Sequence, residues 1–546
     1  MARSINGREL KEMLLSASNN LYNHYPEIDA LNVFPVPDGD TGMNMNLTLA
    51  SGAKEIQNRN DDDAYTIVNA FSRGLLMGAR GNSGVITSQI FRGFASSLKD
   101  KSVVKVQDFI DAMANGATVA YKAVMRPVEG TILTVIREAS EALSDKADKL
   151  STLEDTLDFF LKEARASLKR TPELLPVLKE VGVVDSGGAG LVRIIEGMTL
   201  SIHGKFVEKK EATSVSAPKE ASVAHADSDE LGYRVEFGLA LGPVESKKPF
   251  IESRFKTFLE SRGSDIMIAK EGEIIKVCII SQTPGAILTF AQSYGEFVNI
   301  KIVNLSEKVL VKEAEAPKKE EKHEPSKDFG LVAISAGKGV DEIFRELGVD
   351  EIVSGGQTMN PSIEDIVGAI RKTDAKDVFV FPNNSNIVMA ALQASDVLAD
   401  EVKVHVVVTR TIPQGIVAAS AFSPDISADE NYKNMKEEIK RIQSGSITYA
   451  IKDTVIDGVE VTKDYYMGIK DKKIVVCEKN LLNALYKLLA QMINDETFLV
   501  TILIGEGVEE KQEKALTEKL KKKYENVEFD IRHGDQPVYS FLIGVE

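Results

Sequence analysis

The chain has 546 residues, more than one hydrophobic core usually organises, so two to four domains are expected. Its composition, 43% hydrophobic and 27% charged, is typical of a globular protein. The formal net charge of −16 argues against nucleic acid as the main partner, because binding to phosphate backbones needs a basic surface.

Cysteine usage and hydropathy indicate the compartment. Cys278 and Cys477 lie far apart and outside any metal-ligand spacing, so no disulfide framework is expected. The sequence contains no run of about eighteen apolar residues, which predicts no integral membrane segment. The first eleven residues are polar and lack the apolar core of a signal peptide. We therefore expect a cytoplasmic protein.

Two segments are poor in large apolar residues and rich in Lys, Glu and Ala. They are 208–230 and 312–327, and they are predicted to be linkers, because they cannot bury enough surface to offset the entropy of ordering. They divide the chain into three predicted domains: 1–207, 231–311 and 328–546.

The first predicted domain is helical. Apolar residues recur at three- and four-residue steps over 10–21, 132–143 and 157–168, which indicates one buried face on each helix. Glycine-rich loops separate such helices, so this domain is expected to gather its glycines at helix starts.

The first loop reads Asp38-Gly39-Asp40-Thr41-Gly42 and precedes a helix predicted from about Asn44. Two carboxylates around one glycine can converge on a cation, and Mg²⁺ prefers oxygen ligands together with substrate phosphates. Asp and Thr before a helix are also common as N-caps. The motif alone fits a metal loop and a simple cap equally well.

Three more loops have the same character: 78–84, 126–133 and 184–190. Small residues at a helix start let backbone N–H groups approach a phosphate, and the helix dipole favours anions there. The loop at 78–84 is not a Walker A loop, because no Gly-Lys-Ser/Thr follows. Each loop alone could be a capped helix start or close packing, but together they favour a nucleotide site.

The other two predicted domains contain strands. In the second, 235–239 and 274–280 read as strands and 250–259 as a helix, which fits a small α+β domain. In the third, apolar runs at 331–334, 378–381 and 402–408 alternate with helices, which favours a mostly parallel α/β sheet. Runs at 498–504 and 527–530 are expected to continue that order, and whether this part forms one lobe or two stays open.

The loops DGDTG, GARGNSG, RPVEGTIL and GVVDSGGAG, in this order, resemble the nucleotide-binding subunit of dihydroxyacetone kinases. The chain is more similar still to the three-domain ATP-binding subunit of bacterial fatty acid kinase, whose strings recur at 354–362, 381–386 and 411–415. The resemblance covers the whole chain. It implies an all-α antiparallel helical barrel, a small α+β middle domain and a DegV-like α/β C-terminal domain.

The resemblance also implies an ATP and Mg²⁺ site. Asp38 and Asp40 would bind the metal and serve catalysis. Asn32 would be a neutral third ligand, because no acid stands in the few residues upstream where relatives carry a third aspartate. Arg126 is expected to be the catalytic cation, and Arg80 is a second candidate for that role. Each could instead be a surface or packing residue. The residues expected around the nucleotide are Thr41, Gly42, Asn44, Asn82, Ser83, Gly84, Thr131, Asp185, Ser186 and Gly187.

A zinc site is where the chain departs from its relatives. Their middle domains often carry Tyr-Cys-x-Glu and His-x-His, whereas this chain has Tyr233-Arg234-Val235-Glu236 and Cys278-Ile279-Ile280. Zinc normally needs three or four protein ligands. No zinc is predicted, and Cys278 is expected to be a small apolar strand residue.

The implied reaction moves the γ-phosphate of ATP to a fatty acid carboxylate, giving an acyl phosphate for phospholipid synthesis. The acceptor is already ionised near neutral pH, so no general base is needed. Catalysis would be positioning and charge neutralisation. The acid would be held by a separate DegV-type fatty-acid-binding protein, docked on the third domain of a homodimeric kinase subunit. Polar residues of that domain could line a site or only cap turns, and none is assigned to catalysis.

Two other functions stay open. A small-molecule kinase of the dihydroxyacetone type would need a base, which a partner chain would provide. Alternatively, a regulator could bind ATP without turnover.

Overall fold

The computed structural model describes residues 3–33, 39–210, 233–240, 255–256, 258–259, 262–271, 274–281, 283–304, 325–356, 359–450, 453–456, 458–471 and 473–546. The chain forms two compact units. One combines residues 1–211 with 325–546, and the other contains residues 212–324. The three domains predicted from the linkers are thus arranged so that the outer two share one unit.

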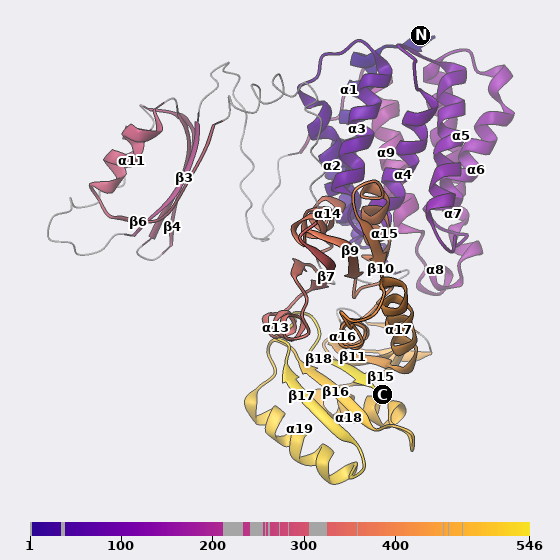
Figure 1. Cartoon of the computed structure of the whole chain (residues 1–546). Helices are drawn as coiled ribbons and strands as arrows, with labels where there is room; N and C mark the ends of the chain where they lie inside the picture. The colour runs from indigo at the N-terminus through magenta and orange to yellow at the C-terminus, as the bar shows by residue number, and fades with distance from the viewer. Residues whose placement is uncertain are drawn as a thin grey trace. The chain divides into compact units, whose positions relative to one another are not determined.

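The N-terminal domain is helical, as predicted (Figure 1). A two-residue antiparallel pair, β1 (Ser4–Ile5) and β2 (Val104–Lys105), joins the start of the domain to the segment before α5. The helices are α1 (Gly7–Asp29), α2 (Thr41–Gln57), α3 (Ala64–Gly78), α4 (Gly81–Ser97), α5 (Val106–Ala123), α6 (Ile132–Asp145), α7 (Leu153–Leu174), α8 (Pro176–Val181) and α9 (Ser186–Ile202), with a 3₁₀ turn at Ala147–Lys149.

These helices form a closed ring. From α1 to α7 each helix packs beside the next one in the chain, and α9 packs on α7 and returns to α1. Their antiparallel alternation gathers the N-termini of α2, α4, α6 and α9 at one end (Figure 1). The glycine-rich loops precede these same helices, so the fold brings them together.

A chain of aromatic contacts fills the ring. Phe71, Phe91, Phe94, Phe109 and Phe160 are buried and meet edge to face, with centroids 5.2 to 6.4 Å apart. Such T-shaped pairs add to the free energy that burial alone provides. They join α3, α4, α5 and α7 into one core.

The C-terminal domain has two lobes. The first is a parallel four-stranded sheet in the order β10-β9-β7-β8, which confirms the predicted parallel order. Its strands are β7 (Lys327–Ser335), β8 (Glu351–Ser354), β9 (Ala375–Phe381) and β10 (Lys403–Val406). Its helices are α13 (Lys338–Glu346), α14 (Ile363–Lys372), α15 (Val388–Val397), α16 (Ile412–Ser420) and α17 (Ala428–Arg441).

The second lobe confirms the expected parallel order for the runs at 498–504 and 527–530, which form β16 and β17 with helix α19 between them, but the rest of its sheet is antiparallel. Its sheet runs β15-β14-β11-β18-β16-β17, and of the described pairs β16–β17 is parallel while the others are antiparallel. A short apolar run fits either orientation, so hydropathy could not decide. The strands are β11 (Gln443–Tyr449), β14 (Tyr466–Lys470), β15 (Lys473–Glu478), β16 (Leu499–Ile504), β17 (Glu528–His533) and β18 (Phe541–Val545), with a hairpin of β12 (Thr454–Ile456) and β13 (Val459–Val461).

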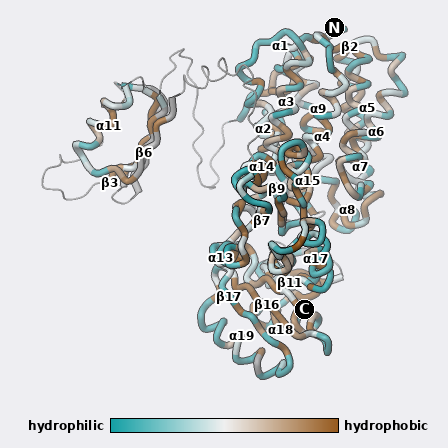
Figure 2. Tube along the Cα trace, viewed as in Figure 1, coloured by the Kyte–Doolittle hydropathy of each residue, from teal (hydrophilic) through white to brown (hydrophobic). Residues whose placement is uncertain are grey.

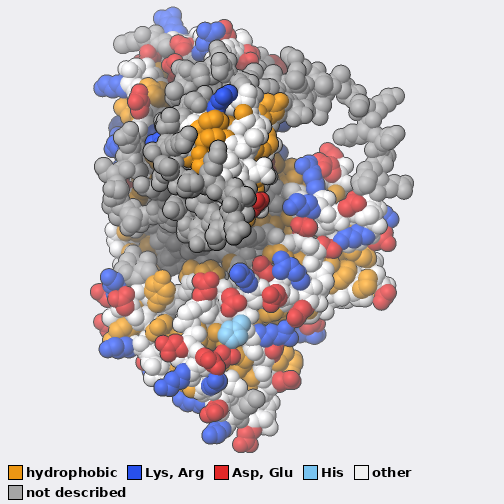
Figure 3. Space-filling view, turned by 90° about the vertical axis from the view of Figure 1, so that its left-hand side faces the viewer, with side chains coloured by type: hydrophobic (Ala, Val, Ile, Leu, Met, Phe, Trp, Pro, Cys, Tyr) orange, Lys and Arg blue, Asp and Glu red, His pale blue; other side chains and the backbone are white. Residues whose placement is uncertain are grey.

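Helices α18 (Leu481–Met492) and α19 (Glu510–Lys523) accompany this second sheet. Figure 2 shows α19 as largely hydrophilic and strand β16 as hydrophobic, which is typical of a surface helix beside the buried centre of a sheet. On the face seen in Figure 3, acidic and basic side chains are interspersed over the C-terminal domain, so the two signs of charge largely offset each other there.

The middle unit is a four-stranded antiparallel sheet, β4-β5-β3-β6, with helix α11 (Pro284–Gln292). The strands are β3 (Tyr233–Ala240), β4 (Ser264–Glu271), β5 (Ile274–Ser281) and β6 (Glu296–Asn304). Both predicted strands are therefore confirmed, while the helix predicted at 250–259 lies largely outside the described residues. Cys278 lies within β5, paired in register with Glu236.

The helical domain and the first C-terminal lobe share a buried apolar cluster. Ala79 and Val85, which flank the start of α4, are fully buried among residues of β7, β9, α14 and α15. The amide N–H of Ile363 donates to the carbonyl of Ala79 at 3.2 Å. Buried Gln89 donates to Gln393 at 2.7 Å. None of the helices in the described ranges combines the length and apolarity that a bilayer crossing requires.

Candidate functional site

Three helix N-termini meet at one point of the helical domain. The Ser83 hydroxyl of α4 donates to the carbonyl of Thr41 at 3.4 Å, and the Ser186 hydroxyl of α9 donates to Thr41 Oγ1 at 3.2 Å. Thr41 opens α2, so the starts of α2, α4 and α9 lie within hydrogen-bonding reach. The first N–H groups of a helix have no partner within it, and they favour bound anions.

Asp29, at the end of α1, caps α2. Its Oδ1 atom accepts the N–H groups of Gly42 at 2.7 Å and Met43 at 3.1 Å. Burial raises the pKa of Asp29 to about 6, although the two N–H groups lower it, and the nearby charge of Asp40 raises it further. This acid was not predicted, because a third acid was expected only in the few residues directly before the loop. Asn32 is buried in the turn that follows α1.

Asp40 occupies the N-cap position of α2, but its side chain makes no capping bond. Its Oδ2 atom instead accepts the side-chain amide of Asn360, from the C-terminal domain, at 2.6 Å. The motif alone had left open that its aspartate only caps the helix. The structure shows that Asp29 caps α2 and that the Asp40 side chain does not. Asp38 lies outside the described residues.

The second glycine-rich loop is closely packed. Gly81 has a φ of +59°, and a Cβ atom there would come within 2.6 Å of Asn44 Nδ2 and 3.4 Å of Asn360 Nδ2. The amide of Asn82 donates to Asn386 Oδ1 at 3.0 Å. Gly84 packs on Thr48, whose Oγ1 would lie 2.3 Å from an added Cβ atom. Polar residues of the C-terminal domain therefore lie against the second glycine-rich loop.

The third and fourth loops meet at Asp185. Its carboxylate accepts the N–H of Gly188 at 2.6 Å, at the start of α9, and the N–H of Ile132, at the start of α6. Burial raises the pKa of Asp185 to about 6 against the lowering effect of these two bonds. Thr131 donates to the carbonyl of Val128 at 2.7 Å, and Gly187 packs on Ile132. The simpler alternative for this loop, a capped helix start, therefore applies to Asp185, whose carboxylate caps α9.

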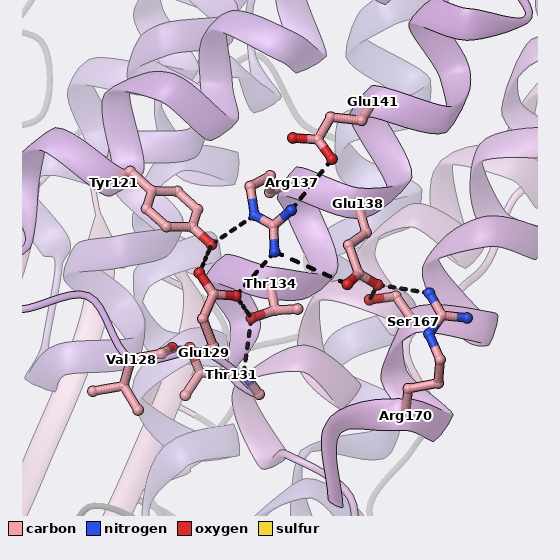
Figure 4. Close-up of polar contacts among 11 residues, drawn as sticks. Tyr121, Val128, Glu129, Thr131, Thr134, Arg137, Glu138, Glu141, Ser167 and Arg170 are labelled. Carbon is pink, nitrogen blue, oxygen red and sulfur yellow. Dashed lines mark hydrogen bonds and ion pairs between the residues drawn. The ribbon is translucent and has the colours of Figure 1, made fainter. Parts of the chain in front are cut away.

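Arg126 is exposed in the loop between α5 and α6. The same loop is fixed by a network around Arg137, drawn in Figure 4. Arg137 contacts Glu129 at 3.0 Å and the Tyr121 hydroxyl at 3.1 Å. Burial alone would raise the pKa of Glu129, but hydrogen bonds from Thr134, Arg137 and Tyr121 outweigh it and lower that pKa. Arg137 lies in a helix predicted only from its apolar face, so its role was not foreseen.

The donor set around Asp40 fits Mg²⁺ and a nucleotide. Within the described ranges no three His, Cys, Asp or Glu side chains are grouped to hold a metal, but Mg²⁺ in nucleotide sites usually takes one or two carboxylates and completes its shell with phosphates and waters. Asp40 offers a carboxylate, and the start of α4, which has no side-chain cap, offers N–H groups. In the described structure the Oδ1 atom of Asn360 is buried and makes no hydrogen bond, which leaves one more oxygen beside the carboxylate.

Comparison with known proteins assigns the class first. Residues 35–200 match the DAK2 domain, a kinase-related domain. Residues 230–310 and 330–546 match the middle and C-terminal domains of the FakA-like proteins, which are named after a fatty acid kinase subunit. The chain is 41% identical to Protein YloV of Bacillus subtilis and 39% identical to an uncharacterized protein of Staphylococcus saprophyticus, over 100% of each chain. The chain belongs to the FakA-like family of fatty acid kinase subunits.

Similarity to solved structures is weaker. A DegV structure described as a fatty acid binding protein from Bacillus subtilis is 14% identical, covers 40% of this chain and 98% of that one, and has a TM-score of 0.30. The dihydroxyacetone kinase of C. freundii is 20% identical, covers 37% of this chain and 35% of that one, and has a TM-score of 0.28. Scores this low do not establish a common fold.

Proposed function

We propose that this chain is the ATP-dependent kinase subunit of a fatty acid kinase. It transfers the γ-phosphate of ATP to the carboxylate of a fatty acid held by a separate DegV-type binding protein. The acyl phosphate product serves phospholipid synthesis. The observation that carries the proposal is the Asp40 carboxylate, which lies where three helix N-termini meet and is not used as a helix cap. Membership of the kinase-subunit family supports it.

The residues divide into a metal set and a phosphate set. Asp38 and Asp40 hold Mg²⁺, with Asn32 as a neutral ligand. When bound, the metal neutralises charge on the transferring phosphate. The phosphates lie beside the starts of α2, α4 and α9, where the uncapped N–H groups of α4 and the hydroxyls of Thr41, Ser83 and Ser186 can donate. The residues assigned to the nucleotide are Thr41, Gly42, Asn44, Asn82, Ser83, Gly84, Thr131, Asp185, Ser186 and Gly187.

The acceptor decides what the protein must supply. A fatty acid carboxylate is ionised near neutral pH, so the protein does not need to remove a proton. The obstacle is repulsion between two anions, which the helix dipoles and a cationic side chain reduce. Arg126, exposed in the loop before α6, is the side chain proposed for that purpose.

The test is formation of acyl phosphate from ATP, Mg²⁺, a fatty acid and a purified DegV-type protein, trapped by hydroxylamine. Asp38→Asn and Asp40→Asn should each reduce the rate at least about 100-fold, because a metal carboxylate is lost. Asp63→Asn is the matched control. Asp63 caps α3 by accepting the N–H of Thr66 at 2.7 Å, and Asn caps equally well, so activity should persist.

Other outcomes would redirect the assignment. Absence of acyl phosphate with a range of acyl-binding partners would contradict the proposal. Partner-dependent phosphorylation of a small hydroxyl compound would indicate a kinase of the dihydroxyacetone type. Nucleotide binding without turnover of any acceptor would indicate a regulator.

Two further properties belong to the same proposal. The purified chain should be a homodimer by light scattering. Elemental analysis should find no stoichiometric zinc, because the middle domain keeps only Cys278 of the soft ligands carried by relatives. One zinc per chain would contradict the second expectation.

A further inference from the structure

One contact at the acidic loop crosses from one domain to another. Asn360 lies between β8 and α14 of the C-terminal domain and is only 3% exposed. Its side-chain amide donates to Asp40 Oδ2 at 2.6 Å, across 320 residues of sequence. A hydrogen bond this short to an ionised carboxylate is of the stronger, charge-assisted kind.

Asn360 is itself held in place from the helical domain. The Arg80 guanidinium donates to the backbone carbonyl of Asn360 at 2.7 Å and lies 3.6 Å from the carboxylate of Asp365. Asp365 in turn accepts the N–H and the hydroxyl of Ser362, which form the capping box of α14. Arg80 therefore fixes both the Asn360 backbone and the helix that follows it.

A carboxylate can serve an amide and a metal ion together. Its two oxygens offer about four acceptor positions, so a hydrogen bond to Oδ2 leaves positions for a cation. Metal-ligating carboxylates are commonly oriented by such hydrogen bonds, and loss of the partner typically weakens the metal about 10- to 100-fold. The Asp40 side chain makes no cap bond on its own helix, and the hydrogen bond from Asn360 is a contact that can orient it.

We propose that Asn360 is a positioning residue of the metal site: the C-terminal domain orients the Asp40 carboxylate for Mg²⁺. This inference rests on the proposed function. It gives the C-terminal domain a second task besides docking the acyl-binding protein, and it makes the metal site dependent on the contact between two domains.

The test measures metal affinity in the full-length chain without any acyl partner. Electron paramagnetic resonance of Mn²⁺, with a non-hydrolysable ATP analogue, reports the Mn²⁺ dissociation constant directly. Asn360→Ala should raise that constant about 10- to 100-fold. Binding of the analogue without metal should be unchanged, because Asn360 acts on the metal ligand and not on the phosphates.

Gln393→Ala is the control variant. Gln393 joins the same two domains through Gln89, at 2.7 Å, and both side chains are buried. The Gln393→Ala variant should lower the melting temperature at least as much as Asn360→Ala does. Its Mn²⁺ dissociation constant should equal that of the wild type. Arg80→Lys is a second variant with a smaller expected loss of affinity, because Lys keeps the charge but not the planar fork.

The outcomes separate the inference from the function on which it rests. Wild-type Mn²⁺ affinity in a folded Asn360→Ala protein would overturn the positioning role and leave the kinase proposal intact. An equal loss in Gln393→Ala would also overturn it, since the domain contact as a whole would then set the affinity. If the wild type bound neither Mn²⁺ nor the analogue, the proposed function and the inference would fall together.

Discussion

At the scale of single residues, Asp40 and Asp185 show how the same amino acid at the same helical position serves two purposes. Both stand at an N-cap. Asp185 accepts N–H groups at the start of its own helix and at the start of α6. In contrast, α2 is capped by Asp29, and Asp40 accepts a hydrogen bond from Asn360 instead. The sequence motif could not distinguish these cases, because the difference depends on acids and amides brought in from elsewhere in the chain.

Asp185→Asn should shift stability with a definite dependence on pH. The pKa of Asp185 is raised from 3.8 to about 6 in the fold, so the folded protein holds this proton more tightly than the unfolded chain. The wild type therefore loses stability as pH rises from about 4 to about 6, by up to about 3 kcal/mol from this group. The Asn variant does not titrate there. The free energy of unfolding of the Asn variant, measured by urea unfolding followed by circular dichroism, should therefore rise relative to that of the wild type between about pH 4 and about pH 6. A difference in unfolding free energy that stayed constant over this pH range would contradict the prediction.

At the scale of elements, periodicity located the helices well and their ends less well. The apolar spacing at 10–21, 132–143 and 157–168 falls inside α1, α6 and α7. The helix expected from about Asn44 begins at Thr41, because Asp29 satisfies the N–H groups of Gly42 and Met43. That cap comes from the end of the preceding helix, a tertiary contact with no local signal.

Asp29→Ala should destabilise the start of α2. Two helix N–H groups lose their acceptor, and loss of a cap typically costs about 0.5–2 kcal/mol. Asp29→Asn keeps an acceptor oxygen and should cost less. Hydrogen exchange at the amides of Gly42 and Met43 measures the effect, with faster exchange expected in the Ala variant. Unchanged exchange in both variants would show that the cap is not needed.

Gly84→Ala should destabilise the packing of α4 on α2. The added methyl group would meet Thr48 Oγ1 at 2.3 Å, and overpacking of this kind costs about 1–3 kcal/mol. Removing the obstacle in a Gly84→Ala, Thr48→Ala double variant should recover part of the loss in a thermal melt. Gly368→Ala in α14 is the control, because nothing lies within 4 Å of its added Cβ atom, and it should be neutral or stabilising.

At the scale of the whole molecule, the grouping of the outer two domains was not foreseen from the sequence. Residues 1–211 and 325–546 share one unit. The contact depends on small apolar residues such as Ala79 and Val85 and on the pair Gln89 and Gln393. In sequence such residues look like any helix interior. In the last sheet the parallel pair expected at 498–504 and 527–530 is confirmed, but the antiparallel pairing of the other strands was not predicted, since apolar runs do not reveal which neighbour a strand pairs with.

That grouping predicts that the two outer segments associate without a covalent connection. Residues 1–211 and 325–546, produced together as separate polypeptides with a tag on one, should co-purify, because their contact buries an apolar cluster and paired polar groups. Val85→Asp would place a charge in that cluster and should abolish the association. Co-purification that survived this change would contradict the prediction.

The contact between Asp40 and Asn360 also has a consequence for synthesis on the ribosome. The two residues are 320 positions apart, and at typical translation rates of about 5–20 residues per second the second follows the first by roughly 16–64 s. The helical ring can fold during that interval, but its acidic loop has to wait for its amide partner. A nascent or prematurely terminated chain can therefore present a complete helical domain without the amide partner of Asp40. Under the proposed role of Asn360, full metal affinity would arrive only when synthesis is well past its midpoint.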